Sequence, residues 1–377
     1  MKILVVGGGP SGLYFSYLIK RSHPGIEVKV VEQNPSNATF GFGVVFSDKA
    51  LEFLHSDDEQ TYNYLMPHMR YWPDLKIVHK DEHMAIDGNG FAAIGRLQLL
   101  NLLQSLCLQT GVLFDFNTEF KDIKNDYNYD YIVAADGANS SIRKNYKEEF
   151  RSSETILKNP FIWFGTTKLF DCLSLTFRLN NDGVFCAHHY PYNSHMSTFI
   201  VETDPKTYEK AGFSAKDERS IKAYCEEVFA IDLDGHELLT NKSVWRWFPQ
   251  VWNERWSHEN IVLIGDALHT AHFSIGSGTR LAMEDAICLF EAINEHLSDK
   301  TAALNQFEVK RRPKLEKLID ASIASALWYE KMDELVRSLE PYEFAKSYMI
   351  RTGRVSDEKL KSIAPNFMKR YSYYHAS

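Results

Sequence analysis

Three glycines near the N-terminus are spaced as in a phosphate-binding turn. They form the pattern GxGxxG directly after the short apolar run at residues 3–6. In such a turn one glycine permits the sharp bend, one lets the backbone approach a pyrophosphate, and one lets the next helix pack on the strand. The helix N-terminus then offers N–H groups and a positive dipole end to the phosphates. The predicted binding residues are Gly7, Gly9, Pro10, Ser11 and Gly12.

An acidic residue follows at the spacing that such a site needs. Glu32 comes twenty residues after Gly12, at the end of a second apolar run at residues 28–31. A carboxylate there can accept hydrogen bonds from both hydroxyls of an adenosine ribose, and it would repel a 2′-phosphate. GxGxxG alone could mark any tight strand-to-helix turn, but here strand, turn, helix, strand and acid follow in order. The pattern predicts a bound dinucleotide, either FAD or NAD.

Two further motifs follow apolar strand patterns later in the chain. Residues 136–143 fit DGxxSxxR, and Gly265-Asp266 is followed by glycines at 276 and 278. Together with GxGxxG, in this order and across nearly the whole chain, they resemble the single-component flavoprotein aromatic hydroxylases, the para-hydroxybenzoate-hydroxylase-like family. The resemblance implies that the bound dinucleotide is FAD.

The resemblance also implies roles for individual residues. Asp266 would bond the ribityl chain of FAD, and the helix after Gly276 and Gly278 would aim its N-terminus at the pyrimidine edge of the flavin. A positive dipole end there would stabilise negative charge on the reduced flavin. Arg96 matches an arginine that contacts FAD; its other interpretation is a solvated arginine at a helix terminus.

The DG motif has two interpretations. In the family it is said to touch both FAD and the reducing nicotinamide, which implies a cofactor role for Asp136. The alternative is structural, with Asp136 and Arg143 forming a salt bridge across the turn. The only GxGxxG is assigned to FAD, so NADH or NADPH is expected to bind transiently at the surface as a co-substrate.

Four segments are similar to one subgroup of this family. They are residues 41–48, 162–171, 196–203 and 265–286. The subgroup comprises salicylyl-CoA 5-hydroxylase, the monooxygenase half of 2-aminobenzoyl-CoA monooxygenase/reductase and the tryptophan hydroxylase of violacein biosynthesis. The four segments resemble the first of these most. The resemblance implies an FAD-dependent monooxygenase that uses NAD(P)H and O2 and transfers oxygen to an activated ring through a C4a-hydroperoxyflavin. The implied substrate is an aryl-CoA thioester such as salicylyl-CoA or 2-aminobenzoyl-CoA.

Other substrates and another class of protein remain open at this point. One alternative is a hydroxylase of a free or carrier-tethered aromatic amino acid or indole, as for tryptophan. Another is a flavin- or NAD-binding protein that hydroxylates nothing. A thioester needs a groove to the surface with Lys or Arg near its mouth, whereas a free amino acid needs a closed pocket with a carboxylate clamp. The sequence does not choose between them.

The histidines supply the candidate catalytic side chains. His269 and His272 lie beside the predicted flavin, so a substrate-facing role is expected for one of them. His188 and His189 are adjacent in an alternating strand, where one should face the interior and the other solvent. Each is expected to be a core histidine with a satisfied hydrogen bond. The sequence has no HxH or HExxH spacing, so no metal site is predicted.

The elements that must position these residues predict an α/β fold, α+β overall. A Rossmann-like FAD-binding domain is expected to be discontinuous, with an inserted antiparallel-sheet substrate domain and a helical C-terminus. The predicted boundaries are 1–70, 92–158 and 256–300 for the FAD-binding domain, 71–91 and 159–255 for the substrate domain, and 301–377 for the helical region.

The composition excludes several classes of protein. The 377 residues include 42 Lys+Arg and 50 Asp+Glu, a net charge of −8, which excludes a basic nucleic-acid binder. No window of eighteen apolar residues predicts a membrane span. Five widely spaced cysteines favour free thiols in a reducing cytoplasm. The aromatic content of 13% suits a protein that buries both a flavin and an aromatic ring.

Overall fold

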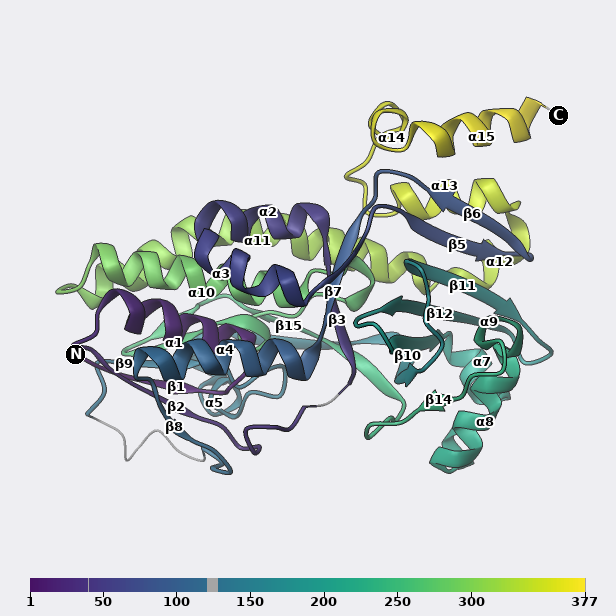
Figure 1. The fold of residues 1–377 in the computed structure, drawn as a ribbon. Helices are drawn as coiled ribbons and strands as arrows, with labels where there is room; N and C mark the ends of the chain where they lie inside the picture. Colours follow the sequence, from purple (N-terminus) through teal and green to yellow (C-terminus); the bar gives the residue numbers. More distant parts are fainter. Residues whose placement is uncertain (40, 121–127, 377) are drawn as a thin grey trace.

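The computed structural model describes residues 1–39, 41–120 and 128–376, so residues 121–127 of the predicted segment 92–158, and Ser377, lie outside the described residues. The described elements fall into two halves (Figure 1). One half holds a parallel sheet with long helices, and the other holds a large, mostly antiparallel sheet with the C-terminal helices. Strands β3 (Gly43–Ser47) and β7 (Phe91–Gly95) run between them.

The parallel sheet forms from residues that are far apart in the chain. Its order is β16-β17-β9-β1-β2-β8, and only β16 runs antiparallel to its neighbour. The strands are β1 (Lys2–Val6), β2 (Glu27–Val31), β8 (Leu113–Asp115), β9 (Tyr131–Ala134), β16 (Ser257–His258) and β17 (Ile261–Leu263). Val5 pairs with Val30 on one side and Val133 on the other, and all three are fully buried. Continuous apolar runs are what a sheet covered on both faces requires.

Three helices pack beside this sheet. Helix α1 (Pro10–Ser22) contacts both α4 (Arg96–Thr110) and α10 (Gly278–Glu295). Smaller helices complete this half: α2 (Asp48–Asp57), α3 (Glu59–Leu65), η1 (Met66–His68), α5 (Ser141–Asn145) and α6 (Lys147–Phe150). Helix α4 ends at Gly111, which takes the left-handed conformation with φ +88°. Glycine is favoured at such a helix end because it lacks a Cβ.

The large sheet has the order β14-β10-β13-β12-β11-β5-β6, and β15 also pairs with β10. Its pairs are antiparallel except β11 with β5. The strands are β5 (Leu75–His79), β6 (Glu82–Ile86), β10 (Ser152–Thr166), β11 (Leu173–Leu179), β12 (Val184–Pro191), β13 (Ser197–Thr203), β14 (Leu238–Leu239) and β15 (Arg246–Asn253). A third sheet, β3-β7-β4, includes β4 (Arg70–Trp72).

Helices cover both faces of the large sheet. Beneath one face lie α7 (Pro205–Lys210), η3 (Phe213–Ala215), α8 (Glu218–Val228) and α9 (Ala230–Leu233). The other face packs against C-terminal elements: α11 (Lys300–Tyr329), α12 (Met332–Ser338), α13 (Pro341–Ile350), α14 (Asp357–Ile363) and α15 (Pro365–Ala376). The first two-thirds of α11 packs on α10 and joins the core of the parallel sheet.

Coverage of both faces corrects one prediction. His188 and His189 point to opposite faces of β12, but neither faces solvent, because they are 5% and 3% exposed. His189 stacks against Phe199 and lies 3.8 Å from Phe170 between ring centres. The predicted mixed fold, with parallel and antiparallel sheets and a helical C-terminus, is confirmed. Among the described helices, none has the length and apolar character to cross a membrane.

Candidate active site

A cavity of about 1310 Å³ lies where the two halves meet. Its wall includes the GxGxxG turn, β3, the start of α4, the DG turn, residues 270–271 and 273–280, and the strands β11 to β13. Single small-ligand pockets span roughly 300–1,000 Å³. The cavity therefore has room for more than one small ligand.

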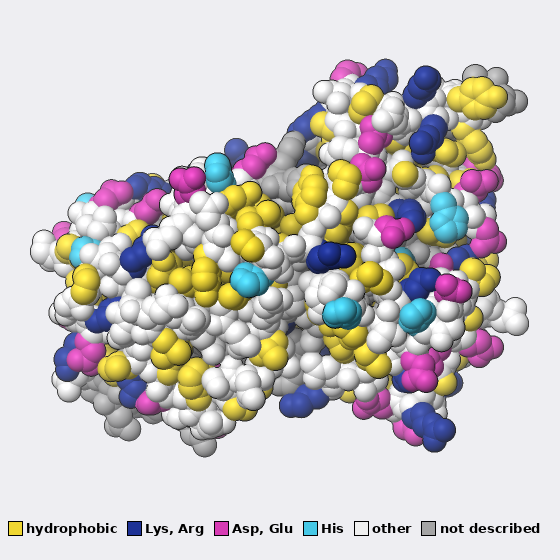
Figure 2. Space-filling view, in the orientation of Figure 1, with side chains coloured by type: hydrophobic (Ala, Val, Ile, Leu, Met, Phe, Trp, Pro, Cys, Tyr) yellow, Lys and Arg dark blue, Asp and Glu magenta, His cyan; other side chains and the backbone are white. Residues whose placement is uncertain are grey.

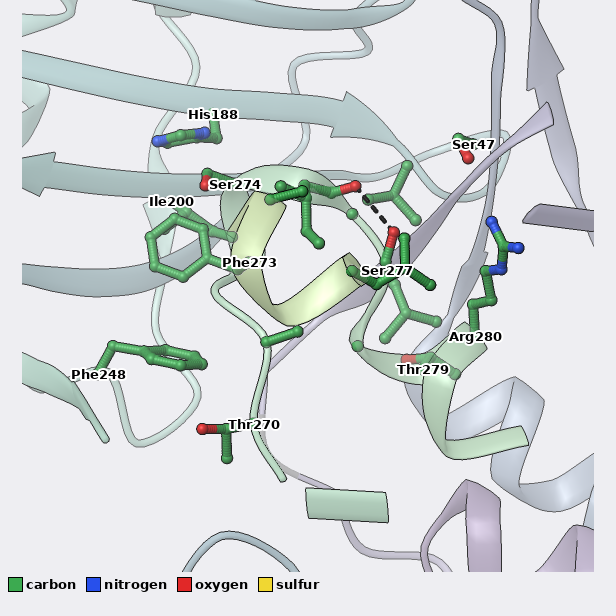
Figure 3. Close-up of a pocket in the computed structure, with 18 of the residues that line it drawn as sticks. Ser47, His188, Ile200, Phe248, Thr270, Phe273, Ser274, Ser277, Thr279 and Arg280 are labelled. Carbon is green, nitrogen blue, oxygen red and sulfur yellow. Dashed lines mark hydrogen bonds between the residues drawn. The ribbon is translucent and has the colours of Figure 1, made fainter. Parts of the chain in front are cut away.

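Residues 273–275, which form the short helix η5, divide the labelled side chains of the cavity into two groups (Figure 3). On one side lie His188, Ile200, Phe248 and Phe273, and on the other lie Ser47 and Arg280. One end is therefore aromatic and apolar, and the other is polar and charged.

Steric crowding explains two of the GxGxxG glycines. Gly7 has φ +109°, and a Cβ there would lie 2.3 Å from the carbonyl oxygen of Ala135. A Cβ on Gly12 would lie 2.2 Å from the carbonyl oxygen of Gly7. Any side chain at these two positions would collide with backbone, so the turn requires glycine there whether or not a ligand binds.

Gly9 is different because none of the described residues crowds it. A Cβ there would meet none of their atoms within 4 Å, and Gly9, Pro10 and Ser11 border the cavity. Gly9 is the N-cap of α1 and provides no side-chain cap for the helix. The first N–H groups of α1 thus lack intrahelical partners at the cavity wall. Such a turn fits the phosphates of a dinucleotide.

Glu32 lies beside this turn, as the spacing predicts. Its Oε2 accepts a hydrogen bond from the backbone N–H of Gly8 at 2.7 Å. Its Oε1 accepts hydrogen bonds from the backbone and the side chain of Asn34, at 2.8 and 2.7 Å. The carboxylate is half-buried and held next to the glycines.

Asp266 and Arg96 both border the cavity. The side chain of Asp266 is accessible and makes no hydrogen bond within the described residues. Although this carboxylate is open to the cavity, the protein around it shields it from bulk water and raises its pKa, and the nearby charges of His269 and Arg96 only partly oppose this. Burial likewise lowers the pKa of Arg96, whose Nε donates to Thr39 Oγ1 at 3.1 Å. Two charged groups at a cavity wall with so few partners fit a polar ligand between them.

Helix α10 begins at the cavity. Gly276 has φ +59°, which favours glycine, and Ser277 is the N-cap. The hydroxyl of Ser277 donates to the carbonyl oxygen of Ile275 at 3.1 Å, so it does not cap the helix (Figure 3). The free N–H groups and the positive dipole end of an eighteen-residue helix therefore face the cavity at Gly278.

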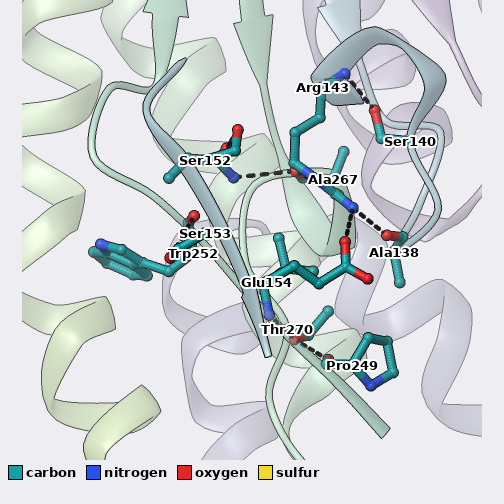
Figure 4. A network of polar contacts seen from close by, with 12 residues as sticks. Ala138, Ser140, Arg143, Ser152, Ser153, Glu154, Pro249, Trp252, Ala267 and Thr270 are labelled. Atoms are coloured by element: carbon teal, nitrogen blue, oxygen red, sulfur yellow. Dashed lines mark hydrogen bonds and ion pairs between the residues drawn. The ribbon is translucent and has the colours of Figure 1, made fainter. Parts of the chain in front are cut away.

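The DG turn is held by a buried arginine. Arg143 is 2% exposed, donates to the carbonyl oxygens of Ala138 and Ala267, and lies 3.4 Å from Glu154 Oε2 (Figure 4). Asp136 instead accepts from the backbone N–H of Ser141 at 2.8 Å, and no ion pair joins it to Arg143 among the described residues. The predicted Asp136–Arg143 salt bridge is therefore wrong for the described residues, since Arg143 is held by Ala138, Ala267 and Glu154 instead. The other oxygen of Asp136 is buried and has no hydrogen-bond partner in the part of the chain that the structure describes.

The two candidate catalytic histidines lie behind the cavity wall. His269 Nε2 bonds Asp285 Oδ2 at 2.8 Å, and Asp285 also accepts from Arg311 Nε at 2.7 Å. His272 Nδ1 pairs with Ser274 Oγ at 2.8 Å, and burial lowers the pKa of His272 to about 4. Neither side chain borders the cavity. Their hydrogen bonds instead hold in place the segment around them, and neighbouring residues of that segment, such as Thr270 and Phe273, do border the cavity.

The structure adds a group that the sequence reasoning did not select. His188 and Tyr190 project from the same face of β12 into the aromatic end of the cavity. Ile200 from β13 and Phe273 lie beside them. The sequence contained the pattern that relates them, because residues two apart in a strand, such as His188 and Tyr190, share a face. What the sequence lacked was the knowledge of which face borders the cavity.

His188 has a carboxylate behind it. Its Nε2 lies 3.1 Å from Glu202 Oε2, and Glu202 is 1% exposed. The other oxygen of Glu202 accepts from Asn159 Nδ2 at 2.9 Å. Burial alone would raise the pKa of Glu202, but the hydrogen bond from His188, the nearby His272 and Asn159 more than offset it, so the pKa lies below its ordinary value. Glu202 is therefore an ionised carboxylate in the core.

Comparison with known proteins identifies the family. Residues 1–322 match the family model described as "FAD binding domain". The chain is 40% identical over 361 residues to salicyloyl-CoA 5-hydroxylase of a Streptomyces species, covering 93% of this chain and 70% of that protein. It is 34% identical to 3-hydroxy-4-methyl-anthranilyl-[aryl-carrier protein] 5-monooxygenase of Streptosporangium sibiricum, covering 89% and 91%. It is 31% identical to protodeoxyviolaceinate monooxygenase of Chromobacterium violaceum, covering 97% and 96%.

Solved structures share the fold. 2-Methyl-3-hydroxypyridine-5-carboxylic acid oxygenase superposes with a TM-score of 0.72 at 16% identity, covering 96% of each chain. PqsL of Pseudomonas aeruginosa, solved with 2-aminobenzoylacetate, superposes with a TM-score of 0.68 at 19% identity, covering 88% of this chain and 96% of PqsL. The glycine turn, the unpartnered Asp266 and the free N-terminus of α10 fit the cofactor that the family model names. The chain belongs to the FAD-binding-domain family of flavoprotein hydroxylases and is an FAD-dependent aromatic monooxygenase.

Proposed function

We propose that the chain hydroxylates an activated aromatic ring carried as a thioester on coenzyme A, such as salicylyl-CoA or 2-aminobenzoyl-CoA, or on a carrier protein. Two relatives support this, since their names give salicyloyl-CoA and an anthranilyl group on an aryl-carrier protein as substrates. The aromatic end of the cavity supplies apolar walls for a ring, including Phe161, Phe248 and Phe273.

The observation that carries the thioester proposal is the cationic part of the cavity wall. The wall also includes Arg354, just before α14, and Lys359, within α14, and both are exposed. Neither has an ion-pair partner within the described residues. Lys and Arg side chains mix with Asp and Glu over the C-terminal helices (Figure 2), so the positive charge is local. This arrangement fits a phosphorylated tail that leaves the cavity there, whereas a free amino acid needs a closed pocket.

The same proposal assigns FAD to the polar part of the cavity. Gly9, Pro10 and Ser11 would hold the pyrophosphate, Glu32 the adenosine ribose, and Arg96 and Asp266 the ribityl chain. Gly276 and Gly278 would border the flavin ring, and Asp136 would lie near the approach of NADH or NADPH. When bound, FAD would supply the electron transfer and oxygen activation that side chains cannot provide.

The chain's own residues would position the cofactor and the substrate ring and shield them from water. The N-terminus of α10 would stabilise negative charge on a group bound at Gly278. Phe248 and Phe273 would exclude water from the ring being oxidised, which protects a reactive oxygen species from competing reactions. Arg351, also in the wall, donates to Ser325 Oγ and the Ser274 carbonyl oxygen at 2.8 and 2.9 Å and brings a positive charge to this end.

We also infer the domain organisation from this division of the cavity. The FAD-binding domain would comprise residues 1–70, 92–158 and 256–300, because the parallel sheet draws its strands from these three ranges. The substrate domain would comprise 71–91 and 159–255. The helical region 301–377 packs on both.

The alternatives have less support. No relative reported above has tryptophan in its name, and the Chromobacterium relative is named for protodeoxyviolaceinate. The relatives are monooxygenases, which leaves no support for a flavin- or NAD-binding protein without oxygenase activity.

The proposal is tested by offering salicylyl-CoA, 2-aminobenzoyl-CoA, tryptophan and the free acids to the holoenzyme with NADH and with NADPH. The expected result is faster oxidation of the nicotinamide and a hydroxylated product with the thioesters. Turnover of the free acids or tryptophan, and not of the thioesters, would reject the proposal that the substrate is a thioester.

A further inference from the structure

One section of the cavity wall is formed where the turn between β6 and β7 meets the chain that runs from the end of α13 into α14. We call it the outer section, because Gly88 in the turn and Arg354 and Lys359 in the chain are exposed. Its other lining residues are Asn89, Gly90, Met349, Thr352, Val355 and Ile363. Apart from the two cations, none of these residues has a role in the function proposed above.

The two segments that form the outer section are packed against each other. Gly88 has φ +65°, and a Cβ there would lie 2.0 Å from the carbonyl oxygen of Ile363, so the turn lies directly on the end of α14. Asp87 accepts hydrogen bonds from the backbone N–H groups of Asn366 and Phe367 at 3.1 and 2.9 Å. Helix α13 contacts β6 as well (Figure 1). The outer section is therefore a fixed part of the fold.

Two half-buried polar side chains of the outer section have unused hydrogen-bonding groups. Asn89 Nδ2 lies 3.9 Å from Met349 Sδ, and a thioether is only a weak acceptor. Asn89 Oδ1 and the hydroxyl of Thr352 have no hydrogen-bond partner within the described residues. Polar groups that are removed from bulk water are normally hydrogen-bonded. An acceptor at Asn89 and a donor at Thr352 therefore fit a polar, uncharged group of a ligand.

The charge of the outer section is confined to Arg354 and Lys359. Arg351 belongs to the same segment, but its guanidinium donates to Ser325 Oγ and to the carbonyl oxygen of Ser274, toward η5. The wall thus combines apolar contacts, one acceptor, one donor and two exposed cations. Pantetheine has the matching composition, because methylene groups, two secondary amides, a hydroxyl and a dimethyl-substituted carbon separate its sulfur from its phosphate, and none of them is charged.

Resting on the proposed function, we propose that the outer section binds the pantetheine arm of the aryl thioester. Asn89 Oδ1 accepts a hydrogen bond from an amide N–H of the arm, and the hydroxyl of Thr352 donates to an amide carbonyl oxygen. Met349, Val355 and Ile363 pack against the hydrocarbon parts. Coenzyme A and carrier proteins have this arm in common, so the site recognises the feature that both forms of the substrate share.

Contacts with the arm lie away from the ring that is oxidised. Such remote contacts supply binding energy that holds a substrate in its reactive orientation. Loss of a contact with the arm is therefore expected to weaken the binding of arm-bearing thioesters and to leave the binding of a ring without an arm unchanged.

The test measures dissociation constants for the oxidised holoenzyme without nicotinamide, from the change in flavin absorbance, so it does not depend on turnover. The arm-bearing ligands are salicylyl-pantetheine, salicylyl-CoA and the salicylyl thioester of a pantetheinylated aryl-carrier protein. The S-ethyl thioester of salicylic acid has the ring and the sulfur but no arm. The variants are Asn89→Ala and Thr352→Val, and the matched controls are Asn366→Ala and Thr301→Val, at exposed positions outside the cavity wall.

Wild type and both controls are expected to bind salicylyl-pantetheine at least about tenfold more tightly than the S-ethyl thioester. Asn89→Ala and Thr352→Val should each weaken the binding of every arm-bearing ligand about 3- to 10-fold, with S-ethyl thioester binding and FAD content unchanged. The tighter-bound of the CoA and carrier thioesters identifies the source of the arm. Thr352→Val keeps the size of the side chain, so the test stays decisive if Asn89→Ala does not fold.

Equal affinity of wild type for salicylyl-pantetheine and the S-ethyl thioester would overturn the inference, as would unchanged binding of salicylyl-pantetheine in both variants. In either case the thioester proposal stands and the arm lies elsewhere. Failure of the proposed function looks different, because wild type would then bind the free acids or tryptophan and none of the thioesters.

Discussion

At the scale of single residues, Asp266 is the clearest candidate for a cofactor contact. Its carboxylate is exposed to the cavity and receives no hydrogen bond from the described residues. Asp266→Ala is expected to weaken FAD binding by about 10- to 100-fold, because a hydrogen bond to a charged group contributes about 1.5–3 kcal/mol. The measurement is flavin absorbance per chain after gel filtration, with a dissociation constant from titration of the apoprotein.

The matched control for this variant is Asp320→Ala, at an exposed position of α11 away from the cavity. It should retain wild-type FAD content. Equal FAD affinity in Asp266→Ala and wild type would remove the role assigned to Asp266.

Buried histidines make a second residue-scale prediction, for stability against pH. Burial lowers the pKa of His189 to about 3 in the folded protein, against about 6.5 when unfolded. Between these values the unfolded chain binds a proton that the folded protein does not, so the free energy of unfolding falls as pH falls below about 6.5. Removing the imidazole should remove this part of the pH dependence.

The measurement compares denaturant unfolding of wild type and His189→Gln at pH 7 and pH 5. The variant is expected to lose about 2 kcal/mol less than wild type between these two pH values. Parallel stability curves for the two proteins would show that His189 is not held neutral in the fold.

At the scale of elements, the GxGxxG turn separates structural glycines from a functional one. Gly9 has φ −79° and open space around it, so alanine fits the fold there. We expect Gly9→Ala to keep the wild-type Tm of the apoprotein and to lose FAD affinity, because the added Cβ projects where the pyrophosphate must approach. Gly25→Ala, at an exposed turn with equally open space, should change neither quantity.

The opposite result for Gly9→Ala would contradict this role. If Gly9→Ala lowers the Tm of the apoprotein and leaves FAD binding intact, the turn is structural alone. Thermal unfolding of apoprotein and a flavin titration distinguish the two results.

Elements also show how far the sequence alone could go. The strand, turn and helix around Gly12 follow from local patterns, and so does the helix that begins at Gly278, because propensity and capping are local properties. The wall formed by His188 depends on which segments cover β12, and those segments, β3, η5 and α11, are distant in the chain. Alternation placed His188 and His189 on opposite faces correctly but could not reveal that both faces are covered.

The histidines beside Asp266 show the same limit. His269 and His272 follow the predicted flavin-binding residue Asp266 closely in sequence, and this proximity suggested that one of them faces the substrate. The imidazole of His269 bonds Asp285 and that of His272 bonds Ser274, and neither ring borders the cavity. Asp285 comes from the middle of α10, and the hydrogen bond that it accepts from His269 could not be predicted without the packing of that helix.

At the scale of the whole molecule, the thioester proposal makes a prediction about charge at the cavity's outer end. Replacing Arg354 and Lys359 together with glutamate should raise the KM for salicylyl-CoA, because two favourable contacts with phosphate become repulsive. Each exposed contact contributes about 0.2–1 kcal/mol, so reversal of both should raise KM about tenfold with little change in kcat. The effect should weaken at high salt, because salt screens exposed charges.

Lys361→Glu is the control, since Lys361 is exposed on the same helix but does not border the cavity. An increase in KM of the same size in the control would mean that net charge alone guides the substrate. No increase in the double variant would place the tail elsewhere.

In the proposed function, a parallel-sheet half that would hold FAD faces an aromatic pocket on a second sheet, and one cavity borders both. The most direct measurement is the mass of the product formed from salicylyl-CoA by the yellow holoenzyme with NAD(P)H under ¹⁸O2. We expect about one FAD per chain and a product that gains one labelled oxygen atom on its ring, with nicotinamide oxidation dependent on substrate. A colourless protein that cannot be reconstituted with FAD, or nicotinamide oxidation that leaves every aromatic substrate unlabelled, would contradict it.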